Sequence, residues 1–130
     1  MALWEDLTAQ LRAEHHLELD EADEVALTLH RRDGEALRAQ RLLVRHSHAW
    51  GRSMIEVRSA FGEAGDYDAD HLLAENLHLP LGAIARHGQY LVLIQKACLE
   101  DLTLEGALFL IKHVGMLADV LEGRRGGDRF

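Results

Sequence analysis

The sequence predicts an α+β fold with a five-stranded antiparallel sheet and three helices, in the order helix, three strands, helix, two strands, helix. Apolar residues recur at helical spacing near both ends of the chain, whereas the middle alternates apolar and polar residues as strands do. Short turn signals separate the strands, which favours antiparallel neighbours. The length of 130 residues suits one domain. We expect that domain over 1–122 and a flexible C-terminal tail over 123–130.

The first half of the chain supplies one helix and three strands. Leu3, Leu7 and Leu11 are spaced as on one helix face. From residue 25 to 30 apolar and polar residues alternate, and Asp33-Gly34 then favours a tight hairpin because both residues tolerate a positive φ. We expect the return strand over about 36–46 and a third strand over about 54–61.

The second half supplies the remaining elements. Acidic residues precede a helical run over 72–77, and acidic side chains favour the first turn of a helix. Pro80 stops this helix, and residues 82–97 are expected to form a hairpin with His87-Gly88 at its turn. Thr103 is a suitable N-cap for a last helix, which ends at Gly123.

Charge and cysteine content narrow the function classes. The chain carries 22 acidic and 14 basic side chains, a formal charge of −8. An acidic surface disfavours nucleic acid, whose binding depends on Lys and Arg, and also anionic membranes. Cys98 is the single cysteine, so no intrachain disulfide forms. The first residues lack the pattern of a signal peptide, and we expect a cytoplasmic protein.

No catalytic or metal-binding motif is found. Nine histidines are present, but none belongs to an H-E-x-x-H motif. The acidic run Asp66 to Asp70 resembles the start of a calcium loop, but it has His71 and Leu77 where such a loop needs Gly and Glu. The serines lack a nucleophile elbow. We expect a non-enzymatic protein without cofactor or metal; a histidine-based metal-binding protein or an enzyme is the alternative.

Several predicted strands are apolar on both faces. Leu42-Leu43-Val44, Met54-Ile55 and residues 91–94 have no polar residue at alternate positions. An antiparallel sheet normally turns one polar face to water. Either a second copy or a partner protein covers the second face, or the middle helix or a loop folds over it.

The middle strands also carry a basic stripe. Two readings are open: the stripe attracts an acidic partner segment, or it pairs within the chain with the acidic run near Asp20. Its members are Arg38, Arg41, Arg45, Arg52 and Arg58.

Four segments resemble the type III secretion chaperone-like superfamily, which includes the Tir chaperone (CesT) and YbjN families. They are Leu-Leu-Ala-Glu-Asn-Leu at 72–77, Leu-Pro-Leu-Gly-Ala at 79–83, Leu-Val-Leu at 91–93 and Leu-Glu-Asp-Leu at 99–102. The resemblance implies a bacterial, cytoplasmic homodimer that holds an extended segment of a client protein through apolar anchors and strand addition. A YbjN-like regulatory adaptor with a folded partner is the alternative.

The resemblance also implies which residues take part. We expect the dimer interface at Leu72, Leu73 and Leu77. We expect the partner-binding residues to be Leu42, Val44, Met54, Tyr90, Val92 and Ile94.

Overall fold

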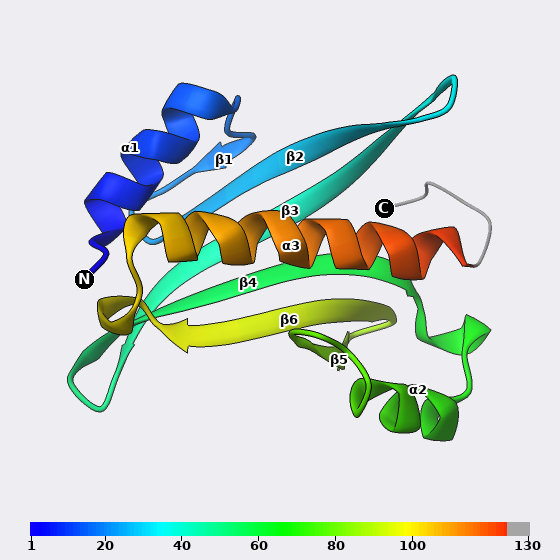
Figure 1. Ribbon diagram of the computed structural model, residues 1–130. Coiled ribbons are helices and arrows are strands. Elements are labelled where there is room, and N and C mark those ends of the chain that lie inside the picture. Colours follow the sequence, from blue (N-terminus) through cyan, green and yellow to red (C-terminus); the bar gives the residue numbers. More distant parts are fainter. Residues whose placement is uncertain (125–130) are drawn as a thin grey trace.

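The computed structural model describes residues 1–124 and contains three α-helices and six strands in that range (Figure 1). The helix–strand order follows the prediction apart from one added strand. The elements are α1 (Trp4–Glu14), β1 (Leu19–Asp20), β2 (Glu24–Asp33), β3 (Ala36–Ala49), β4 (Arg52–Glu63), α2 (Ala69–Asn76), β5 (Ala83–His87), β6 (Tyr90–Cys98) and α3 (Leu104–Gly123), with short 3-10 turns η1 (Ala64–Asp66) and η2 (Leu99–Asp101).

The strands form one antiparallel sheet in the order β1-β2-β3-β4-β6-β5. The prediction of five strands is wrong, because β1 pairs with β2 through Leu19–Ala26 and Asp20–Val25. This strand overlaps the acidic run near Asp20, where the sequence predicted no strand. A strand of two residues is too short to show the alternation of apolar and polar residues by which strands are recognised.

The predicted local signals act as expected. Gly34 closes the β2–β3 hairpin with a φ of 63°. The hydroxyl of Thr103 accepts a hydrogen bond from the amide of Gly106 at 3.0 Å and so caps α3. The predicted tail begins at Gly123, which is the last residue of α3, and its residues 125–130 lie outside the described part of the chain.

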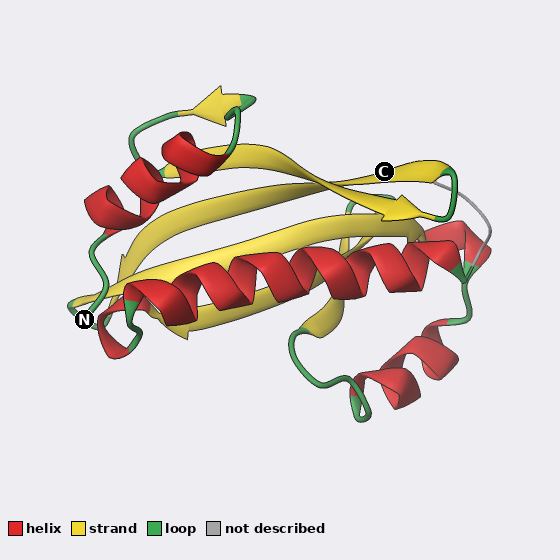
Figure 2. Cartoon of the chain, turned by 45° about the horizontal axis from the view of Figure 1, so that its top comes forward, coloured by secondary structure: helices red, strands yellow, loops and turns green. Residues whose placement is uncertain are grey.

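The helices pack on one face of the sheet, which we call the covered face (Figure 2). Val25, Val44 and Val57 are register partners across β2, β3 and β4, and all three are buried in the core. Side chains of α1, α2 and α3 join the same core, including Leu7, Leu72 and Val114. No described helix is both long enough and apolar enough to cross a membrane.

α3 lies very close to the sheet at Gly115. A β-carbon at this position would be 2.7 Å from Cδ1 of Leu29 and 3.0 Å from Cδ1 of Leu42. Carbon atoms in contact lie about 3.5–4.0 Å apart, so a larger residue would push the helix away from β2 and β3. Glycine therefore sets the depth of this contact.

The far end of the β2–β3 hairpin separates from β4. Pairs between β3 and β4 run from Ala49–Arg52 to Leu43–Arg58, after which β3 continues beside β2 alone. Figure 1 shows the hairpin tip diverging from β4. We call this segment, residues 29–40, the arm.

Side chains bridge the strands where the arm departs. Nε2 of Gln40 donates to Oγ of Ser59 and to the carbonyl of Ala60, both at 2.8 Å. Ser59 in turn donates to the carbonyl of Arg41 at 2.6 Å. These bonds satisfy backbone groups near the end of the β3–β4 ladder, as buried polar groups require.

Candidate functional site

The face of the sheet opposite the helices, which we call the open face, carries four of the predicted partner-binding residues. Register and alternation place Met54, Val92 and Ile94 there, and none of them belongs to the core beneath the helices. Met54 and Ile94 are half-buried, whereas Val92 is only 5% exposed and presents little surface to a partner. Tyr90 lies at the start of the same strand, β6, and is exposed. Since α2 sends Leu72 into the core of the covered face, it does not fold over this surface.

The orientation predicted for Leu42 and Val44 needs correction. Both are fully buried on the covered face and present no surface to a partner. Leu43 lies between them on the open face, in one row with Arg58, Ile94 and Ala83. Successive residues of a strand point to opposite faces of the sheet. An error of one position in the predicted alternation therefore assigns every side chain of the strand to the wrong face.

Ion pairs divide the open face into apolar strips. Arg45 contacts Glu24 at 3.1 Å near one side. Glu56 contacts Arg58 at 2.5 Å and Lys96 at 3.7 Å in the middle of the sheet. Because these charges largely neutralise one another, within β4 and across neighbouring strands, the open face combines half-buried apolar groups with little net charge.

The basic stripe pairs with carboxylates of this chain. Arg41 contacts Glu18 at 3.2 Å, which together with Arg45–Glu24 links the stripe to the acidic run. The other contacts are Arg38–Asp119 at 2.9 Å, Arg52–Asp101 at 2.8 Å and Arg58–Glu56. Of the two predicted readings, the structure therefore favours pairing within the chain.

The acidic run also binds α1. Arg12 makes two hydrogen bonds to the carboxylate of Asp20, at 2.7 and 2.8 Å. These bonds hold the pKa of Asp20 below its usual value, because they favour the ionised carboxylate. The same contact raises the pKa of Arg12. The pair connects the C-terminal part of α1 to the short strand β1.

The β5 edge of the sheet is closed by a side chain. Nδ2 of Asn76 donates to the carbonyl of Ile84 at 3.2 Å, and the amide of Ile84 donates to Oδ1 of Asn76 at 2.6 Å. An amide side chain thus occupies the backbone groups that an added strand would use. Strand addition is blocked at this position of β5.

The three residues expected at a dimer interface differ in exposure. Leu72 is buried in the core, whereas Leu73 and Leu77 are 68% and 83% exposed. Consecutive helix residues differ by about 100° around the axis, so Leu73 points away from the surface that Leu72 covers. α2 therefore anchors to the core through Leu72 and presents Leu73 and Leu77 outward.

An apolar stripe on α3 was missed by the sequence reasoning. Phe109, Met116 and Val120 are 55%, 42% and 43% exposed, and their spacing of seven and four residues places them on one helix face. The ring of Phe109 stacks on the ring of His113, with the two ring centroids 3.8 Å apart. We call this surface the α3 stripe. A helix that is apolar on all sides is the signal that would have revealed it.

A relay of three side chains resembles part of a hydrolase site. Nδ1 of His46 lies 3.0 Å from Oδ1 of Asp23, and Nε2 lies 2.7 Å from Oγ of Ser53. The ring stacks on Trp4 with centroids 5.1 Å apart. However, the amide of Ser53, which would stabilise an oxyanion, donates to the carboxylate of Glu100 at 2.5 Å. The relay therefore fits a role in fixing α1 to the sheet.

In residues 1–124, no three His, Cys, Asp or Glu side chains lie together as a metal ion would need. Cys98 is a free, half-buried thiol whose register partner is Met54. The candidate binding sites are the open face, the α3 stripe, and the exposed leucines of α2.

Comparison with known proteins adds no assignment to these surfaces: no protein family, curated protein or solved structure matches the chain.

Proposed function

We propose that the protein is a non-enzymatic protein-binding module, a cytoplasmic homodimer similar to type III secretion chaperones, which holds an extended segment of a client protein. The observation that carries the proposal is the exposure of Phe109, Met116 and Val120 on one face of α3. Large apolar side chains that are contiguous and exposed mark interaction surfaces in soluble proteins.

The candidate surfaces receive different occupants in this proposal. The second copy packs on the helical side, against the α3 stripe and against Leu73 and Leu77 of α2. The client packs on the open face, where the half-buried side chains of Leu43, Met54 and Ile94 offer apolar anchors between the ion pairs. Anchors on the sheet face carry the client, since Asn76 blocks strand addition at Ile84.

The dimer is tested by measuring mass in solution. We expect light scattering after size exclusion to give twice the chain mass of 14.6 kDa at micromolar concentration. Phe109→Glu combined with Val120→Glu should give the monomer mass, because both charges would be buried in the interface. Leu37→Glu is the matched control, since Leu37 is equally exposed but lies on the β2–β3 hairpin. A wild-type mass of one chain would refute the dimer.

Client binding is tested by selecting peptides from a displayed library on the purified protein. We expect enrichment of extended segments with alternating apolar residues, and loss of their binding in Ile94→Asp. Thr28→Asp, on the same face but in β2, should retain binding. Equal binding to wild type and Ile94→Asp would remove the open face from the proposal.

One observation favours the alternative, a YbjN-like adaptor with a folded partner. Asn76 occupies the backbone groups of Ile84 that an extended peptide would pair with, which favours a folded partner that packs on the sheet face. The same selection separates the two functions. An adaptor would enrich no linear peptide, although Ile94→Asp would still abolish its binding to the folded partner.

A further inference from the structure

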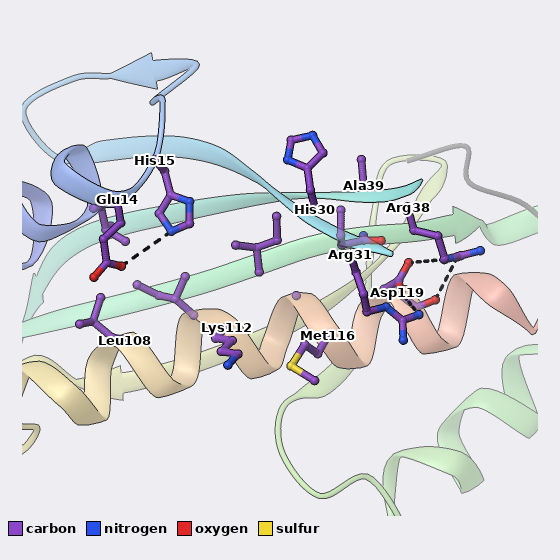
Figure 3. Close-up of a pocket in the computed structure, with 15 residues that line it drawn as sticks. Glu14, His15, His30, Arg31, Arg38, Ala39, Leu108, Lys112, Met116 and Asp119 are labelled. Atoms are coloured by element: carbon purple, nitrogen blue, oxygen red, sulfur yellow. Dashed lines mark hydrogen bonds and ion pairs between the residues drawn. The ribbon is translucent and has the colours of Figure 1, made fainter. Parts of the chain in front are cut away.

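A cavity of about 610 Å³ lies between the C-terminal end of α1, the β2–β3 arm and α3 (Figure 3). Its size falls within the range of pockets that hold small molecules. It is separate from the open face, because α3 and α1 form its walls. Its apolar lining includes Leu11, Leu29, Leu108 and Ile111.

The interior of the cavity is apolar. Leu11 and Ile111 are buried, and Leu29 and Leu108 are half-buried against the core. Gly115 adds a wall without a side chain. Figure 3 shows His30 and Ala39 pointing away from α3, so these two contribute mainly backbone to the lining. An apolar chain would find contacts along this surface.

Charged residues lie at the two ends of the cavity, and Lys112 lies between these ends on α3 (Figure 3). At one end, the buried carboxylate of Asp119 binds both Arg31 and Arg38, the latter at 2.9 Å. At the other end, Glu14 accepts a hydrogen bond from Gln10 at 2.6 Å and lies near His15.

Cations outnumber carboxylates along this lining. Arg31, Arg38 and Lys112 carry three positive charges against the two of Glu14 and Asp119. The lining is thus positive by one charge in a chain whose net charge is −8. Asp119 already binds the guanidinium groups of Arg31 and Arg38. Lys112 is exposed, and the side chain of Arg31 is about half exposed. An anion is the charge that this lining favours.

Gln40 disfavours an anionic group in the interior of the cavity. Its Nε2 donates to Ser59 and Ala60, and its buried Oε1 accepts no hydrogen bond from the described residues. A carboxylate placed beside this acceptor would be repelled and would lose its hydration. The anionic head therefore belongs at the exposed cations, with the apolar part inside.

We propose that this cavity binds an elongated apolar anion of the fatty carboxylate class. The hydrocarbon chain packs against Leu11, Leu29, Leu108 and Ile111, and the carboxylate pairs with Lys112 and Arg31. This site adjoins the proposed dimer surface, because Met116 belongs to the α3 stripe and also lines the cavity.

The test is isothermal titration of the full chain with three ligands that share a hydrocarbon chain: decanoate, decanol and decyltrimethylammonium. We expect decanoate to bind one molecule per chain and the cation to bind at least about tenfold more weakly. Amide chemical-shift changes should concentrate on residues 11, 29 and 108–112. Equal affinity for anion and cation, or shifts centred on the open face, would overturn the proposal.

Two variants locate the head and the tail. Lys112→Glu should weaken decanoate binding about fivefold or more, with decanol unaffected, because an exposed ion pair is replaced by repulsion. Arg32→Glu is the control, since Arg32 is exposed beside Arg31 and is not part of the lining. Leu108→Trp should weaken both ligands by filling the cavity. Unchanged decanoate affinity in folded Lys112→Glu would overturn the assigned head site.

Discussion

Leu93 and Ile94 are neighbours on β6 and show how differently the two faces of the sheet are built. Leu93 is fully buried beneath the helices, whereas Ile94 lies half-buried on the open face beside Arg58. The covered face is a continuous core of apolar side chains. On the open face, ion pairs interrupt the apolar groups. Helix packing thus determines one face, and charge pairing keeps the other compatible with water.

The strongest test of this difference is a matched pair of truncations. Leu93→Ala should lower the free energy of unfolding by about 2–5 kcal/mol, because it removes buried contacts and leaves a cavity. Ile94→Ala should lower it by about 1 kcal/mol or less, since little of the core is lost. Urea unfolding followed by circular dichroism measures both. Equal losses would show that the open face is packed as tightly as the covered face.

A second test concerns how closely α3 approaches the covered face. Gly115→Ala should lower the free energy of unfolding by about 1–3 kcal/mol, because the new methyl group would overlap Leu29 and Leu42. Gly123→Ala is the control, since a β-carbon there meets only the guanidinium of Arg38 at 3.5 Å. The control should be neutral or stabilising. Thermal unfolding of both variants checks this, and a neutral Gly115→Ala would contradict the close contact.

The β5 edge offers a third, smaller effect. Asn76→Ala should lower the free energy of unfolding by about 1–2 kcal/mol, since two hydrogen bonds to Ile84 are lost. It should also raise the tendency to associate through β5, which light scattering detects. Gln89→Ala, in the exposed turn before β6, should change neither quantity.

The smallest effect is expected for the pair between Arg12 and Asp20. The pKa of Asp20 is lowered in the folded state, so the pair stabilises the fold above the unfolded pKa of the carboxyl group. This contribution is lost as the pH falls through the lowered pKa. In Asp20→Asn, the difference in unfolding midpoint between neutral and strongly acidic buffer should shrink slightly. The exposed carboxylate Asp6 provides the control, and Asp6→Asn should preserve the wild-type difference.

Local signals made most of the element order predictable. Asp33-Gly34 and Thr103 each act within a few residues, so they can be recognised without knowledge of the tertiary structure. β1 was missed because two residues carry no periodicity. The ion pair between Arg38 and Asp119 joins residues far apart in the chain, so spacing gave no sign of it.

The candidate surfaces were predictable only in part. Leu42-Leu43-Val44 is apolar throughout, so alternation could not show that Leu43 is the outward residue. The exposed side of α3 could not be predicted for the same reason. Its apolar residues surround the axis, and the packing of the sheet decides that Phe109 stays outside while Val114 is buried. Where a pattern has no polar side, tertiary contacts choose the orientation.

The bridge from Gln40 to Ser59 has a consequence for how the domain opens. Side chains, rather than a continuous backbone ladder, join the arm to β4, and Asp119 holds it to α3 through two arginines. These contacts can break while the central strands stay paired. In hydrogen exchange, we expect amides of residues 29–40 to open together, at a lower free energy than those of β4 and β6. The domain then comprises two cooperative units of unequal stability, and the apolar cavity beside α3 lies on the boundary between them.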